Sequence, residues 1–149
     1  MGWLFDTNDC WSLGGITRDV ELFTLDDVYL EDVTFTSNIT PNLDALIHIR
    51  VNTGPFKQEN NDYKLNVSLT DTQNNHVLNF SQNIKKDSSV FDFRGEIKNP
   101  QLWTAETPNL YRLEVCVVDA KGYVVQRSNE NVGIRDIHID LSLIHISEP

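Results

Sequence analysis

The sequence has little positive charge, almost no cysteine and no long apolar run. Its 149 residues carry 12 Lys and Arg against 22 Asp and Glu, a formal net charge of -10. A surface of this sign repels phosphate groups, which argues against nucleic acids and anionic membrane surfaces as partners. No basic, apolar leader and no run of transmembrane length is present, so we expect a soluble, cytoplasmic protein.

The few cysteines and histidines follow no metal-ligand pattern. Cys10 and Cys116 have no CxxC or Cys/His spacing around them, so both are predicted to be free thiols. The histidines are scattered, and none has a Cys or His partner at a ligand spacing. We therefore predict no metal site in this chain, and we expect four solvated imidazoles: His48, His76, His138 and His145.

Alternation of apolar and polar residues is the strongest pattern in the chain. Residues 43–52 (LDALIHIRVN), 63–70 (YKLNVSLT) and 111–118 (YRLEVCVV) place apolar side chains at every second position, as half-buried strands do. About seven strands predict an all-β, immunoglobulin-like antiparallel β-sandwich over residues 25–140. Its less regular strands are expected at 28–36, 77–84, 90–97 and 124–132.

Polar breakers separate the expected strands. DTQNN (71–75) is predicted to be a turn, and DAKG (119–122) a tight hairpin connection in which Gly122 takes a positive φ. The opening segment differs, because a bend at Gly14–Gly15 is followed by one short strand that cannot bury its own apolar surface. We interpret residues 1–24 as the end of a sheet that lies upstream.

Residues 99–111 (NPQLWTAETPNLY) fit neither a strand nor a helix. Asn99 and Thr107 each precede a proline, so both are predicted to be extended, and residues 99–110 to cross between the sheets as a stiff strap. Leu102 and Trp103 are expected to plug one end of the sandwich.

The end of the strap carries two further expectations. Tyr111 is predicted to form a tyrosine corner, in which its hydroxyl bonds a backbone group upstream. Glu106 is expected to hold a nearby backbone amide or an arginine, because no second acid or His is placed to work with it in catalysis.

Three stretches carry a family resemblance: WSLGGITRDVEL (11–22), NPQLWTAETPNLYRLEV (99–115) and NVGIRDIHI (131–139). In this order they resemble the end of a sugar-binding jelly roll, the strap of an immunoglobulin-like second domain, and the last strand before a catalytic barrel. The family is glycoside hydrolase family 2, most closely its β-galactosidase branch. Its structural signature is matched by Trp103, Glu106, Pro108 and Tyr111.

The resemblance implies a bacterial parent enzyme of carbohydrate metabolism that hydrolyses β-galactosides with retention of configuration. Such enzymes use two glutamates roughly 5 Å apart as acid/base and nucleophile. In this family both belong to the barrel that follows the sandwich. The chain is therefore expected to be an inactive fragment with no catalytic residue, no cofactor and no metal of its own. The parent is expected to bind magnesium and sodium and to be a homo-oligomer.

One residue matches a position that reaches the parent's active site. By resemblance, Asp19 corresponds to the aspartate that approaches the galactose pocket and a bound sodium ion. The alternative is an Arg18–Asp19 ion pair or a turn cap at the end of a sheet, and without the barrel only this alternative applies.

The resemblance divides the chain into three parts. Residues 1–24 are expected to end an incomplete jelly roll, 25–140 to form the sandwich, and 141–149 (LSLIHISEP) to be a tail that resembles a translated sequencing adaptor. Two alternatives stay open: a stand-alone immunoglobulin-like binding or adhesion module, and the same domain from a β-glucuronidase or β-mannosidase.

Overall fold

The computed structural model describes residues 16, 18–22, 24–25, 28–54, 62–85 and 88–136. The expectations for Gly14–Gly15, for the thiol of Cys10, for His138 and His145 and for the tail 141–149 lie outside these residues. Within the described ranges, no helix is long and apolar enough to cross a membrane.

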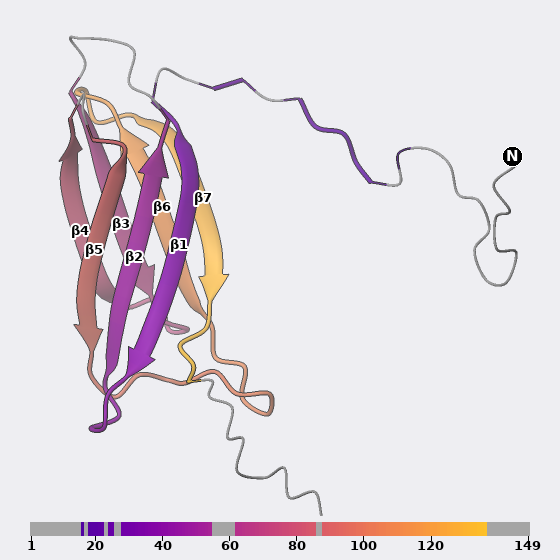
Figure 1. Ribbon diagram of the computed structural model, residues 1–149, viewed down its shortest axis with the longest axis vertical. Coiled ribbons are helices and arrows are strands. Elements are labelled where there is room, and N and C mark those ends of the chain that lie inside the picture. Colours follow the sequence, from indigo (N-terminus) through magenta and orange to yellow (C-terminus); the bar gives the residue numbers. More distant parts are fainter. Residues whose placement is uncertain are drawn as a thin grey trace, which may run out of the picture.

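The described part of the chain folds into two antiparallel sheets packed face to face (Figure 1). One sheet has the order β1-β2-β5 and the other the order β4-β3-β6-β7. This arrangement confirms the predicted all-β sandwich of seven strands. β4 pairs with β3 and so belongs to the second sheet. In a constant-type immunoglobulin domain the fourth strand belongs instead to the sheet that contains the first and second strands. The strands are β1 (Leu30–Ile39), β2 (Ala45–Thr53), β3 (Tyr63–Thr70), β4 (His76–Ile84), β5 (Val90–Ile97), β6 (Tyr111–Val118) and β7 (Val124–Val132).

The alternating pattern of the sequence produces the core directly. In β2, every second residue points between the sheets and is buried, while the residues between them face outward. β3 and β6 repeat this arrangement from the opposite sheet. Each large aliphatic side chain buried in this way stabilises the fold by about 1.5–3 kcal/mol. The two inner faces meet through Ile47, Ile49, Val51, Leu65, Val67, Leu69, Leu113, Val115 and Val117.

The hairpins β1–β2, β3–β4 and β6–β7 share one loop design. Three residues connect the paired ends, and the last has a positive φ: 63° at Leu43, 63° at Asn74 and 88° at Gly122. A backbone hydrogen bond closes each loop at its base, with N···O distances of 2.8 to 3.0 Å. The predicted turn at 71–75 and the predicted conformation of Gly122 are both confirmed.

The bounds of the first two strands differ from the prediction by two or more residues. Leu43 was expected to begin a strand and face the core, but it ends the β1–β2 loop and is 65% exposed. The alternating pattern runs on into the loop, which the turn residue Pro41 opens. The first strand spans Leu30–Ile39 rather than 28–36, because it pairs with β2 as far as the Ile39–Ala45 pair.

The upstream segment forms no strand among its described residues, 16, 18–22 and 24–25. All of them are exposed, and Leu22 is fully so. The described residues of the predicted leftover strand therefore do not form a strand, since a strand needs a hydrogen-bonded neighbour and the described part of the chain places none beside them.

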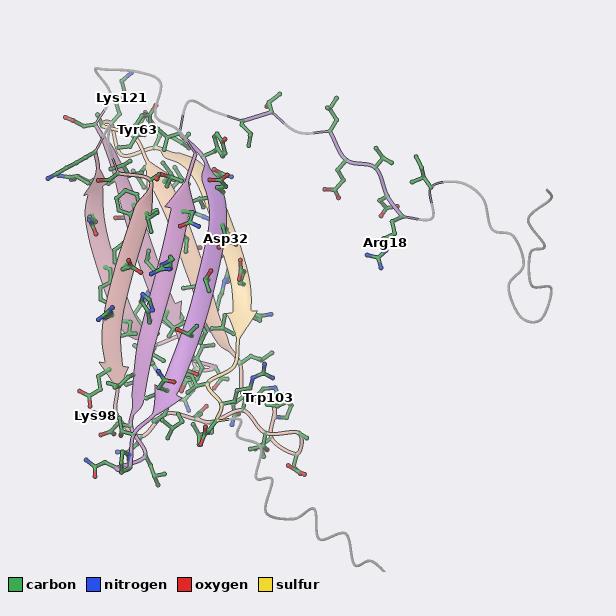
Figure 2. The ribbon with its side chains drawn as sticks, in the orientation of Figure 1. Arg18, Asp32, Tyr63, Lys98, Trp103 and Lys121 are labelled. Carbon is green, nitrogen blue, oxygen red and sulfur yellow. The ribbon has the colours of Figure 1, made fainter. Side chains whose placement is uncertain are left out.

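The chain enters and leaves the sandwich at opposite ends. β1 and β7 run in the same direction, so the chain enters β1 at one end and leaves β7 at the other (Figure 1). Lys121 and Tyr63 mark the entry end, and Lys98 and Trp103 mark the exit end (Figure 2). A nine-residue strand is roughly 30 Å long, which sets the distance between the two ends.

Candidate functional site

The strap lies across the exit end of the sandwich, where it joins β5 of one sheet to β6 of the other. Its first residue is not extended as predicted: Asn99 has φ 47°. Asparagine tolerates this left-handed region better than most residues, and here its amide donates to Asp44 Oδ1 at 3.2 Å. Lys98 Nζ also contacts the Asp44 carboxylate, at 3.0 Å. The Lys98 ammonium and the Asn99 amide lower the pKa of Asp44.

The predicted tyrosine corner is confirmed at the other end of the strap. Tyr111 is buried, and its hydroxyl accepts a hydrogen bond of 2.8 Å from the backbone amide of Gln101. Burial of the phenol raises the pKa of Tyr111. The strap is thus attached to the β1–β2 loop through Asp44 and to the second sheet through Tyr111.

Between these attachments the strap closes on itself. Trp103 and Pro108 form an isolated antiparallel bridge. Within this small loop, the Thr107 amide donates to Thr104 Oγ1 at 2.9 Å, and the two threonine hydroxyls lie 2.8 Å apart. Asn109 Nδ2 donates to the Leu102 carbonyl at 3.0 Å. These bonds join the loop to itself, and residues 104–108 are exposed.

Trp103 is the residue of the strap that meets the departing chain. Its amide donates to the Ile134 carbonyl at 2.8 Å, and Arg135 Cζ lies 5.5 Å from the centroid of its ring. Gly133 passes so close that a Cβ there would lie 3.0 Å from Trp103 Cβ. Trp103 is only half-buried, so the expected plug is partial. Leu102 is also half-buried, but it packs against the core.

A shallow groove of about 690 Å³ runs beside this contact. Its walls come from the free edge of β1, the end of β7 and the strap, and they include Phe35, Asn38, Trp103, Leu110, Glu130 and Arg135. The lining mixes polar, charged and aromatic side chains, a composition that suits non-covalent contact.

Glu106 does not play its expected role. It lies exposed in the strap loop and forms no hydrogen bond or ion pair with the described residues. The short bonds between Thr104 and Thr107 satisfy the backbone around it and leave its carboxylate in solvent.

Asp19 lies on the exposed upstream segment. Neither the Arg18–Asp19 ion pair nor a turn cap is formed among the described residues. The role that the resemblance implies for Asp19 in a larger enzyme therefore stays a prediction.

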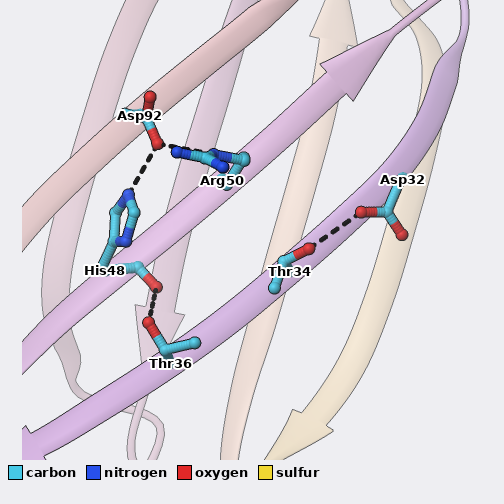
Figure 3. Close-up of polar contacts among 6 residues, drawn as sticks. All are labelled: Asp32, Thr34, Thr36, His48, Arg50 and Asp92. Carbon is cyan, nitrogen blue, oxygen red and sulfur yellow. Dashed lines mark hydrogen bonds and ion pairs between the residues drawn. The ribbon is translucent and has the colours of Figure 1, made fainter.

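A charged cluster on the outer face of the first sheet was not predicted (Figure 3). Asp92 Oδ1 lies 2.6 Å from His48 Nε2 and 2.9 Å from Arg50 Nε. Arg50, and then His48, lower the pKa of Asp92. His48 is thus not the simply solvated side chain expected, whereas His76 is exposed. The sequence shows the outward positions of β2 and β5, but only their pairing register brings these three residues together.

Cys116 is a free thiol, as predicted, and it lies on the outward side of β6, where it is nevertheless buried. Arg127 and Glu114 flank it, with Arg127 Nε 3.6 Å from Glu114 Oε2. Burial raises the pKa of Cys116, which keeps the thiol protonated and weakly nucleophilic. Among the described residues, no group of three or more His, Cys, Asp or Glu could hold a metal ion.

The fold and the strap define a class: a small, immunoglobulin-like β-sandwich whose termini leave at opposite ends. The family model of glycosyl hydrolases family 2 matches residues 28–135, which covers the whole sandwich. The chain belongs to this family.

Relatives of similar sequence are much longer proteins. A β-galactosidase from Alteromonas mediterranea is 33% identical over 93% of this chain, and one from Priestia megaterium is 30% identical over 97%. The chain spans only 14% of the length of each. A relative from Formosa agariphila, named as a candidate β-glucuronidase, is 34% identical over 86% of this chain and 15% of its own length.

Solved structures share the fold. A glycosyl hydrolase family 2 member from Bacteroides cellulosilyticus superposes with a TM-score of 0.64 at 19% identity, covering 76% of this chain and 16% of its own. The β-glucuronidase of Parabacteroides merdae gives a TM-score of 0.63 at 21% identity, covering 74% of this chain and 14% of its own. At these identities the likeness concerns the sandwich alone.

Proposed function

We propose that this chain is the non-catalytic spacer domain of a retaining β-galactosidase-type glycoside hydrolase. In that role the sandwich holds an upstream sugar-binding domain and a downstream catalytic barrel at a fixed separation and orientation. The magnesium, the sodium and the pair of catalytic glutamates belong to the larger enzyme in this proposal, as does its homo-oligomeric assembly.

The opposite placement of entry and exit is the observation that carries this proposal. A domain whose termini lie side by side adds a branch to a polypeptide, whereas one whose termini lie at opposite ends adds length. Here the sandwich separates the two ends by the length of its strands, roughly 30 Å for nine residues, and the two-layer core lies between the entry end and the exit end (Figure 1). Such a domain fixes where the following domain lies relative to the preceding one.

Chain length supports the assignment of catalysis to other parts of the enzyme. A β/α barrel takes about 250 residues, more than the 149 present, and the sandwich already uses most of these. The outward faces of the described strands carry charged and small polar side chains, with no open row of stacked aromatics such as an independent sugar-binding platform needs.

A direct test uses the purified chain and two chromogenic substrates, a β-galactoside and a β-glucuronide. We expect no turnover of either above a blank without protein. Measurable hydrolysis by the chain alone would overturn the non-catalytic assignment. The companion test is to sequence the natural DNA on both sides of this reading frame, where we expect a downstream barrel with two glutamates.

The substrate specificity of the parent needs the extended protein. The Alteromonas and Priestia relatives, which match more than nine-tenths of this chain, are both β-galactosidases, and this favours a β-galactoside as the substrate. The Formosa relative supports a β-glucuronidase parent instead. Assay of the extended protein on both substrates separates the two, and Asp19→Asn in that protein tests whether this carboxylate contributes to substrate or sodium binding.

A further inference from the structure

Three consecutive residues that leave β7 each contact Trp103 by a different interaction. Gly133 packs against its side chain, the Ile134 carbonyl accepts from its amide, and the Arg135 guanidinium lies over its ring. Ile134 itself is fully buried. A chain that leaves an edge strand ordinarily loses its partners and gains freedom within a residue or two. Here it is held for three residues beyond the strand.

We propose that Trp103 is a positioning residue that fixes the direction in which the chain leaves the sandwich, and that Arg135 completes this contact. The purpose of such a clamp rests on the proposed spacer function, because the exit direction sets how the next domain is oriented. The clamp itself is a property of this chain alone and can be tested without any neighbouring domain.

The strap gives the clamp a fixed base. Asn99 is bonded to Asp44 beside the first sheet, and Gln101 is bonded to Tyr111 of the second sheet. Trp103 follows these two anchors within four residues, and its bridge to Pro108 holds the far side. Both sheets of the sandwich therefore fix the position of the Trp103 ring, and β7 does not do so alone.

The residue types fit this role. Tryptophan has the aromatic face that attracts a guanidinium most strongly, and an Arg at 5.5 Å lies within the range of that attraction. Glycine at 133 allows this close approach: a Cβ there would lie 3.0, 3.1 and 3.3 Å from Trp103 Cβ, Cγ and Cδ1, a tighter contact than most side chains make. A tryptophan that served only as a plug would need neither a close glycine nor a stacked arginine.

The experiment measures backbone order in the full chain by ¹⁵N relaxation, together with amide hydrogen exchange. In the unsubstituted protein we expect order parameters near the rigid-backbone value of about 0.85 for Ile134, Arg135 and Asp136. Arg135→Ala removes an exposed side chain, and we expect it to lower the values at 135 and 136 toward about 0.6. It should also speed exchange of the Trp103 amide, which donates to Ile134, by about tenfold.

Arg112→Ala is the matched control, because Arg112 is an exposed arginine of β6 near the same end and bonds Asn129 at 3.2 Å. It should leave residues 134–136 and the Trp103 amide unchanged. The Leu113 amide in the core reports any general loss of stability and should exchange equally slowly in both variants. Gly133→Ala provides a second disturbance, with the same expected loss of order.

Two results would overturn the clamp. One is an order parameter below about 0.6 at residues 134–136 in the unsubstituted chain. The other is no change at these residues in Arg135→Ala. Either would leave the family membership and the spacer proposal standing, whereas hydrolysis by the isolated chain would remove the spacer proposal and leave the clamp.

Discussion

The backbone amide of Gln101 donates a 2.8 Å hydrogen bond to the hydroxyl of Tyr111, ten residues further along the chain. This bond ties the strap to the first residue of β6, and the ring of Tyr111 is buried in the core. One side chain thus belongs to the sandwich by its ring and to the strap by its hydroxyl.

Tyr111→Phe tests the contribution of that bond. The substitution keeps the ring but leaves the part-buried Gln101 amide without its acceptor, so we expect the free energy of unfolding to fall by about 1 kcal/mol. Denaturant unfolding followed by circular dichroism measures the change. Tyr123→Phe, at an exposed tyrosine of the β6–β7 hairpin, is the control and should be nearly neutral. Equal effects in both variants would contradict the tyrosine corner.

Leu43→Gly should stabilise the protein. A left-handed conformation costs a side-chain-bearing residue roughly 1–2 kcal/mol, and glycine loses roughly 0.5–1 kcal/mol in chain entropy. Because Leu43 is largely exposed, little burial is lost, and we expect a net gain of about 0.5–1 kcal/mol in denaturant unfolding. The reverse change in the equivalent loop, Gly122→Leu, should destabilise. A loss of stability in Leu43→Gly would mean that the leucine makes a contact that outweighs its strain.

The Asp92 cluster predicts a specific acid sensitivity. Arg50 and His48 hold the pKa of Asp92 below its ordinary value of 3.8, so the folded state binds this proton less readily than the unfolded state. The stabilisation is present above that value and is lost as the pH falls below it. Asp92→Asn should therefore flatten the decline of stability below about pH 4. Thermal unfolding at several pH values between 2.5 and 6 measures this decline of stability.

Asp19→Asn is the control for this measurement, since that carboxylate is exposed and bonds no described residue. Its stability should fall with decreasing pH in the same way as that of the unsubstituted chain. If the stability of the unsubstituted chain, Asp92→Asn and Asp19→Asn declined identically at low pH, the cluster would contribute nothing to stability.

Gly54→Ala should be harmful for steric reasons alone. A Cβ at this position would lie 2.1 to 2.5 Å from ring atoms of Tyr29, whose carbonyl already accepts from the Gly54 amide at 2.9 Å. We expect a loss of about 1–3 kcal/mol, as overpacking commonly causes. In a Tyr29→Ala background the same substitution should be nearly neutral, so a double-mutant cycle isolates the clash. Additive effects would refute it.

The sequence predicts the local parts of this fold well. Period-two alternation is a property of neighbouring residues, so the strands 63–70 and 111–118 have their predicted bounds, and the less regular strands 90–97 and 124–132 also have theirs. The positive φ of Gly122 was also predictable, because glycine allows it in a tight turn. The hydroxyl bond of Tyr111 was predictable because this tyrosine starts a strand directly after the proline-bounded strap.

The parts that were missed depend on partners distant in the chain. Asp92 meets His48 and Arg50 across 44 and 42 residues, through a register that alternation alone does not specify. The conformation of Asn99 depends on the Asp44 carboxylate, 55 residues away. Glu106 was expected to hold a backbone amide or an arginine, but it lies exposed in a loop where hydrogen bonds join Thr104 and Thr107 instead.

The shared loop design of the three hairpins also has a consequence for how the chain folds. Each hairpin joins strands that are adjacent in sequence, and such units form in about 1–10 μs. The other pairings are remote in sequence: Lys64 pairs with Val118 where the β3–β4 and β6–β7 hairpins join, and Ala45 pairs with Ile97 where β5 joins the β1–β2 hairpin. Because these pairings close much longer loops than the hairpins do, we expect them to form after the hairpins and to limit the rate of folding.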